Sequence, residues 1–123
     1  MKPRISVFKG REAKLNKAIL LILAEESPLN ISQVYKKVRT HKDLQHTRYR
    51  VVNRRMKALE KEGYIEQVRT MKTPQGFVAK LYQSTPRAYL AFVLNAINFD
   101  MLIQSAEQSD IVILLATFLN AIE

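Results

Sequence analysis

Residues 47–65 read TRYRVVNRRMKALEKEGYI, and this stretch decides the predicted fold. Its apolar side chains recur at intervals of three, four and three residues, at Tyr49, Val52, Met56 and Leu59. That spacing predicts a helix over residues 47–62 with one narrow apolar stripe. Gly63 stands where the end of a helix needs a left-handed residue, a conformation that glycine adopts without a Cβ clash.

Two further helices are predicted before this one. Residues 11–26 contain no glycine or proline and carry apolar side chains at helical spacing, at Leu15, Ala18, Ile19, Ile22 and Leu23. Asn30, with Gln33 three residues later, has the pattern of a capping box for a short second helix that ends before Arg39. A polar connection over residues 40–46 then leads into the helix over 47–62.

After Gly63 the residue types change to those favoured in β-strands. They form two groups, Tyr64, Ile65 and Val68, and then Phe77, Val78, Leu81 and Tyr82. Between the groups, residues 73–76 read TPQG, with proline and glycine at positions that suit a type I turn. The pattern predicts a β-hairpin.

Pro86 marks the predicted boundary between a first domain, residues 1–86, and a helical region, residues 87–123. The first holds 19 of the 20 Lys and Arg and seven of the 11 Asp and Glu, a formal charge of +12, whereas the second carries −3. Apolar residues occupy 34 of the first 86 positions and 24 of the last 37. Thr85 before Pro86 is typical of a helix start, and Asn98 and Ser109 resemble the caps of two more helices. We therefore expect a basic domain that binds a polyanion, followed by helices that must be covered.

Length and composition narrow the class of protein. The chain has 123 residues, the size of one globular domain, with a net charge of +9 and a pI near 10.0. Such a surplus favours nucleic acid or an anionic membrane surface as partner. No apolar stretch approaches the roughly 20 residues that cross a bilayer, and the first residues lack the pattern of a secretory signal. We expect a cytoplasmic protein with no membrane partner.

The sequence offers little that is typical of an enzyme. It has no cysteine, so thiolate catalysis and cysteine-bound metals are excluded. His41 and His46 are five residues apart, which does not place two ligands on one helix face, so we expect no metal site. Three glycines leave no phosphate-cradling loop. We predict a protein that is not an enzyme and has no cofactor; whether it senses a small-molecule effector stays open.

The helix over 47–62 carries the strongest functional signal. Four arginines fall within residues 48–55 and no carboxylate compensates them there. Such a helix suits the major groove of DNA, where Arg and Asn bond to base edges and other cations bind phosphate. The predicted contacts are Thr47, Arg48, Tyr49, Arg50, Asn53, Arg54, Arg55 and Lys57, joined from the hairpin by Arg69, Lys72, Gln75 and Lys80. The alternative for any charge run is an ordinary solvated face.

Two segments resemble the winged helix-turn-helix domains of MarR-like and PadR-like transcriptional regulators. Residues 56–65, MKALEKEGYI, look like the close of the recognition helix, and residues 79–86, AKLYQSTP, look like the second wing strand running into a threonine-capped helix. The resemblance covers residues 13–95. It implies a mainly α fold with a small β-hairpin, a recognition helix that begins at Thr47, a wing around residues 73–76, and dimerisation through helices outside the domain.

The helical region independently suggests a homodimer. Its last helix is apolar on most of its surface and needs cover on more than one side, which a partner subunit would supply. The predicted contacts are Leu90, Val93, Leu94, Ile97, Ile111, Leu114, Leu115, Phe118 and Ile122. The alternative is that this helix folds back on the helix over 11–26 of the same chain.

The leading hypothesis is a homodimeric transcriptional regulator that binds double-stranded DNA sequence-specifically. Residues 47–62 would enter the major groove, and residues 69–80 would lie on the backbone or in the minor groove. One alternative is a winged-helix protein that binds DNA or RNA without sequence preference, as a chromatin or ribosome-associated factor would. Another is a protein-interaction module whose tail docks on a larger assembly.

Overall fold

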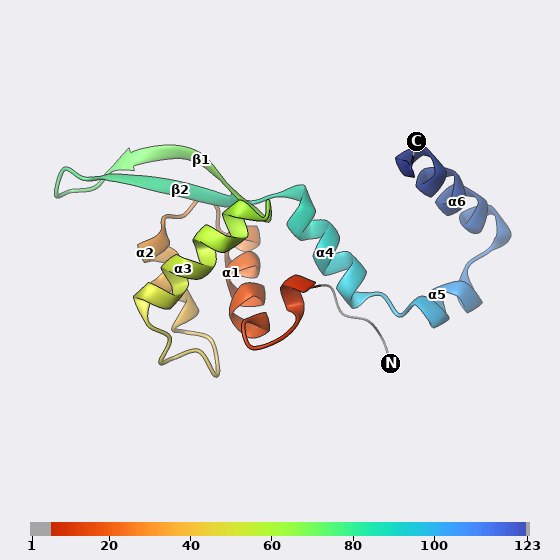
Figure 1. Cartoon of the computed structure of the whole chain (residues 1–123), viewed down its shortest axis with the longest axis horizontal. Coiled ribbons are helices and arrows are strands. Elements are labelled where there is room, and N and C mark those ends of the chain that lie inside the picture. Colours follow the sequence, from red (N-terminus) through yellow and green to blue (C-terminus); the bar gives the residue numbers. More distant parts are fainter. Residues whose placement is uncertain (1–5, 123) are drawn as a thin grey trace.

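The apolar spacing of the first half produces three helices in the computed structural model, which describes residues 6–122 (Figure 1). A short 3₁₀ helix, η1 (Ser6–Phe8), precedes them. Helix α1 spans Ala13–Glu25, α2 spans Ile31–Val38 and α3 spans Tyr49–Lys61. All three predicted helices are therefore present, each within two residues of its predicted bounds.

The core forms where the apolar stripes of these helices meet. Val52, Met56 and Leu59 of α3 are no more than 1% exposed and belong to one cluster with buried residues of α1 and α2, including Ile19, Leu20, Leu23, Val34 and Val38. The predicted stripe is confirmed for these three residues and wrong for Tyr49, which is 44% exposed. Because α3 begins at Tyr49, that ring lies at the edge of the core and packs edge-on against the ring of Tyr35, with centroids 5.4 Å apart.

The predicted capping box sets the start of α2. The Asn30 side chain accepts a hydrogen bond of 2.8 Å from the Gln33 backbone, and the Gln33 side chain accepts one of 2.9 Å from the Asn30 backbone. These two bonds satisfy donors that the first turn of a helix otherwise leaves free.

The hairpin is present and projects from the helices (Figure 1). Strand β1 (Ile65–Lys72) pairs antiparallel with β2 (Val78–Ser84), with Lys72 opposite Val78 and an irregularity between Gln67 and Arg69. The Gly76 amide donates to the Thr73 carbonyl at 2.9 Å, which closes the predicted turn. We call β1, the turn and β2 the wing.

The base of the wing is held against the helices. Tyr82 exchanges two backbone hydrogen bonds, of 3.1 and 2.8 Å, with Leu29 just before α2. Burial raises the pKa of the Tyr82 phenol above its ordinary value of 10.0, and the Glu60 carboxylate raises it further. The Tyr82 ring is thus a neutral part of the core. Because Tyr82 also bonds to Leu29, the wing projects from the helices only toward its tip.

Helix α4 (Pro86–Ala96) begins where Thr85 and Pro86 predicted. The Thr85 side chain, however, makes no capping bond; its hydroxyl donates to the Gly63 carbonyl at 2.6 Å. Arg87 Nη1 donates to the Glu62 carbonyl at 2.8 Å. The threonine hydroxyl reaches Gly63 because the strands bring the end of α3 beside the start of α4. In the same place, the Thr85 amide donates a hydrogen bond to the Tyr64 carbonyl.

After α4, the described part of the tail (the tail is residues 87–123) forms the predicted short and final helices, although Ser109, predicted as a cap, lies inside the final one. Helix α5 spans Phe99–Ser105, with Asn98 capping it through the Met101 amide at 3.2 Å, and α6 spans Gln108–Ile122. Helix α4 packs against the core through Ala88 and Ala91, but α5 and α6 extend away from the three-helix body (Figure 1). No helix within residues 6–122 has the length and apolarity needed to span a membrane.

Every described side chain of α6 is exposed. The alternative that this helix folds back on α1 within one chain is therefore wrong. The chain between α4 and α6 contains two breaks, at Ile97–Asn98 and at Ala106–Glu107, and α5 directs α6 away from α1. The side chain of Ile122, a predicted dimer contact, lies outside the described residues.

Candidate nucleic-acid interface

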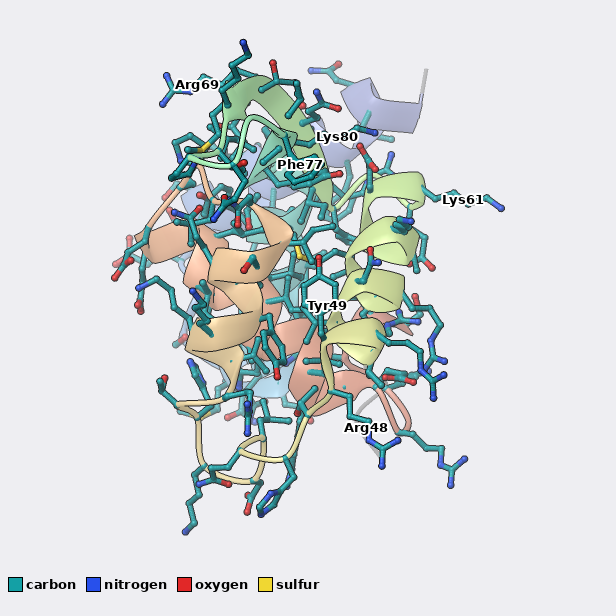
Figure 2. All side chains as sticks on the ribbon, turned by 90° about the vertical axis from the view of Figure 1, so that its left-hand side faces the viewer. Arg48, Tyr49, Lys61, Arg69, Phe77 and Lys80 are labelled. Atoms are coloured by element: carbon teal, nitrogen blue, oxygen red, sulfur yellow. The ribbon has the colours of Figure 1, made fainter. Side chains whose placement is uncertain are left out.

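Helix α3 presents a row of cations on the side opposite its buried stripe. Residues four, three and four apart return to the same side of an α-helix. This spacing places Arg50, Arg54, Lys57 and Lys61 in one line, and all four are exposed. We call these four residues the cationic row. Figure 2 shows Lys61 extending outward from one end of α3 and Arg48 from the other end.

The row is largely free of neutralising carboxylates. Within residues 6–122, no carboxylate lies within 4.0 Å of the cationic group of Arg50, Lys57 or Lys61. Arg54 Nη2 lies 3.9 Å from Glu12 Oε1 in a loose pair whose arginine side chain is 65% exposed. Such an exposed pair is weak, so Arg54 stays available to a phosphate or a base.

Arg55, predicted as a DNA contact, has a different environment. Its side chain is only 18% exposed and lies against α1, where Nε donates to Asn16 Oδ1 at 3.1 Å and lies 4.0 Å from Glu12 Oε2. Asn16 in turn donates to the Val7 carbonyl at 2.9 Å. Arg55 sits beside the buried stripe because it lies three residues after Val52 and four before Leu59, both of which are buried. We leave it out of the proposed DNA contacts.

Asn53 is also turned from the position that base reading requires. Its residue is half-buried, and its Oδ1 is buried without a hydrogen-bond partner among the described residues. A bidentate bond to adenine needs both the oxygen and the nitrogen of the amide at the surface. In this conformation Asn53 does not offer that pair of atoms.

A cluster that the sequence analysis missed holds the first turn of α3. The Tyr49 ring packs on Tyr35, whose hydroxyl accepts a hydrogen bond of 3.1 Å from Arg39 Nη1. The Arg39 guanidinium carbon lies 5.6 Å from the centroid of the Tyr35 ring, and Nε donates to the Gln45 carbonyl at 3.0 Å. The cluster therefore joins the end of α2, the connecting turn and the start of α3. The four-residue spacing of Tyr35 and Arg39 was the available signal.

A cleft of about 480 Å³ lies beside the start of α3. Its lining includes Leu15, Leu44 and Val51, together with the predicted contacts Thr47 and Arg48. Thr47 is half-buried, and Arg48, the residue before the first turn of α3, is exposed.

His41 and His46 take no part in a metal-binding cluster, because residues 6–122 contain no group of three or more His, Cys, Asp or Glu side chains that could hold an ion.

The wing contributes cations on two different faces. Thr70 pairs with Lys80, and Lys72 pairs with Val78, so Lys72 and Lys80 share one face of the hairpin. Arg69 pairs with Leu81 and therefore belongs to the other face. In Figure 2, Arg69 and Lys61 extend in opposite directions. Lys72, Gln75 and Lys80 are exposed near the tip, which lies at the same end of the molecule as the start of α3 (Figure 1).

Together these features define a winged helix-turn-helix protein with exposed cations along its third helix and on its wing. No model of a protein family matches the sequence, and no curated protein matches it. Among solved structures, diamide-treated YodB from B. subtilis is similar to this chain, with a TM-score of 0.56 and 16% identity over 83% of this chain and 88% of YodB. FabT from Streptococcus pneumoniae in complex with DNA gives a TM-score of 0.41 and 18% identity over 98% of this chain and 86% of FabT. The likeness to YodB shows a shared fold, and the predicted fold class is confirmed.

Proposed function

We propose that the protein is a homodimeric transcriptional regulator that binds double-stranded DNA sequence-specifically. The cationic row carries this proposal, because it offers a line of exposed cations on a helix thin enough for the major groove. Arg48 and Tyr49 would contact DNA at the start of α3. Lys72, Gln75 and Lys80 of the wing would follow the backbone or the adjacent minor groove, and Arg69 would contact DNA only if the duplex reached the other face of the wing.

The tail supports the dimer. The exposed fractions of the large apolar side chains of α6 from Ile111 to Leu119 run from 39% to 64%, and Leu90 and Val93 of α4 are 57% and 56% exposed. Apolar surface of this extent marks an interaction site. A second copy of the chain would cover it, with Leu94 and Ile97, both half-buried, at the margin. A twofold axis would then present two copies of α3 to neighbouring turns of one duplex.

The proposal includes the other predicted properties. The division into a DNA-binding domain, residues 1–86, and a dimerisation region, residues 87–123, follows the distribution of charge and apolarity. A regulator of this kind needs neither a cofactor nor a catalytic group, so we propose that the protein is not an enzyme. It would act in the cytoplasm, where a duplex target is accessible.

The salt dependence of duplex binding tests the proposal. Each phosphate that a cation neutralises lowers the slope of log affinity against log salt by about 0.9, so four such contacts by the cationic row would give about −3.6 per protomer. Fluorescence anisotropy titrations across a salt series measure this slope. A slope near zero would contradict the proposal.

Selection of bound duplexes from a random pool then tests specificity. A dimer that reads bases should recover an inverted repeat with half-sites about 10 base pairs apart, centre to centre. Recovery of unrelated sequences with equal affinity would favour the alternative of non-specific binding. Failure to bind any duplex at low salt would favour a protein-interaction module.

Glu12→Gln should strengthen DNA binding by up to about fivefold. The substitution removes the carboxylate that competes with DNA for Arg54, and an exposed pair of this kind is worth at most about 1 kcal/mol. Anisotropy titration at low salt measures the gain. Glu25→Gln, which removes the same charge at the other end of α1, is the matched control. Equal affinities for the two variants would show that Glu12 does not restrain Arg54.

A further inference from the structure

Phe77 at the tip of the wing is an exposed aromatic residue that the proposed contacts leave unexplained. Its exposed fraction is 72%, the highest among the exposed large hydrophobic residues of the described chain. Neighbouring Val78 is 66% exposed. A ring in this position gains little burial within the protomer, so most of its apolar surface is available to a partner.

The backbone that carries Phe77 is well fixed. Its amide donates to Thr73 Oγ1 at 3.1 Å, and its carbonyl accepts a hydrogen bond of 2.7 Å from the Thr73 amide. Gly76, at a φ of +87°, completes the turn. These hydrogen bonds join Thr73 and Phe77 across the turn, so the ring projects from a closed loop. Binding of a partner therefore does not require a long flexible segment to become ordered.

Charge around the ring favours a polyanion over an apolar protein partner. Lys72 and Lys80 share one face of the wing, and Val78 lies opposite Lys72 on that same face. The sequence has no Asp or Glu between Gln67 and Arg87. Figure 2 shows Phe77 and Lys80 on the part of the molecule that faces the viewer when it is seen from the tip of the wing. An apolar tip flanked by cations matches the sugars, base edges and phosphates that line the minor groove.

The arrangement of wing and recognition helix sets where the ring would lie. The tip of the wing and the start of α3 are at the same end of the molecule, opposite α5 and α6 (Figure 1). With α3 in the major groove, the tip therefore reaches the duplex beside it. This step rests on the proposed function.

We propose that Phe77 is an apolar wedge that enters the minor groove and partly unstacks one base step. Insertion of this kind kinks a duplex and is least costly at flexible pyrimidine–purine steps, so it adds sequence preference without hydrogen bonds to bases. Lys72 and Lys80 hold the tip by binding the phosphates on either side of the groove.

Phe77→Ala and Phe77→Leu in the full chain test the wedge. The probe is the duplex recovered by selection, with 2-aminopurine placed at successive adenines beside the half-site. Phe77→Ala should lower affinity about tenfold, remove the rise in 2-aminopurine fluorescence that unstacking produces, and leave the salt slope unchanged because no charge is lost. Phe77→Leu, which keeps an apolar wedge, should retain most of both signals. Lys80→Ala is the complementary control, since it should reduce the salt slope by about 0.9 and preserve unstacking.

The outcomes separate the wedge from the proposed function. Unchanged affinity and unchanged 2-aminopurine fluorescence in Phe77→Ala would overturn the wedge alone. Weaker binding with no fluorescence change between the variants and the unaltered chain would overturn insertion, because the ring would then contact only the groove surface. Absence of duplex binding by the unaltered chain would overturn the proposed function and the wedge together. Thermal melting of Phe77→Ala should match that of the unaltered chain, since the ring is exposed.

Discussion

Leu115→Glu combined with Phe118→Glu is expected to convert the proposed dimer to a monomer. Both side chains are exposed in a single protomer, at 57% and 64%, so their replacement should leave the fold of that protomer intact. In the proposed dimer the same substitutions bury four carboxylates against apolar surface, which is strongly unfavourable. Sedimentation velocity over a range of protein concentrations measures the change.

The same variant should lose affinity for a duplex that contains two half-sites. Coupling two binding domains commonly raises affinity by about 10²- to 10⁴-fold, and a monomer forfeits that gain. Binding to a duplex with one half-site should change little. This difference between the two duplexes distinguishes loss of dimerisation from damage to the DNA-binding domain.

The opposite side of α6 provides a matched control. Helical periodicity places Ser109 and Asn120 on one side of α6, away from Leu115 and Phe118. Ser109→Glu with Asn120→Glu adds the same number of carboxylates to the same helix, and we expect that variant to remain a dimer. If the Leu115 and Phe118 variant also sediments as a dimer, another surface holds the protomers together.

Arg50→Ala and Arg54→Ala are expected to weaken DNA binding more than any other single substitutions in α3. An arginine that bonds a base in two places contributes about 1–3 kcal/mol of discrimination, so its loss would lower affinity for the selected duplex by about 5- to 150-fold and spare other sequences. An arginine that contacts phosphate would instead weaken all duplexes and reduce the salt slope by about 0.9. Anisotropy titrations with selected and scrambled duplexes separate the two roles.

Arg55→Ala is the control for these variants. It removes the same side chain from the same helix, but Arg55 bonds to Asn16 inside the protein. We expect a lower melting temperature and an unchanged salt slope, because the lost contacts stabilise the packing of α3 on α1. A reduced salt slope for Arg55→Ala, with unchanged melting, would show that this side chain turns outward to bind DNA.

The elements of the fold were predictable because their signals are local. The helical spacing of apolar residues predicted α1 and α3. The Asn30–Gln33 pair predicted the start of α2, and residues 73–76 predicted the turn of the wing. Each signal depends on neighbours within about five residues. The fold class was then predicted from the resemblance of these elements, in this order, to winged helix-turn-helix domains.

The features that the sequence did not reveal depend on contacts between distant segments. Arg55 could not be distinguished from Arg54 by residue type, since what separates them is the approach of Glu12 and Asn16 from α1. For the same reason, the Thr85 hydroxyl donates a hydrogen bond to the Gly63 carbonyl and does not cap α4. The face on which Arg69 lies depends on the irregularity in β1, which shifts the pairing of the strands.

The hydrogen bonds from Thr85 and Arg87 to the Gly63 and Glu62 carbonyls, just after the end of α3, tie the direction of that helix to α4. If two tails pair, the distance between the two copies of α3 is therefore set by the angle at which the tails cross, whereas the bases read are set by α3 itself. Joining residues 1–86 to a tail with another crossing angle would keep the recognised bases and alter the number of intervening base pairs. Substitutions in the tail would thus redirect the protein among DNA targets without touching a residue that meets DNA.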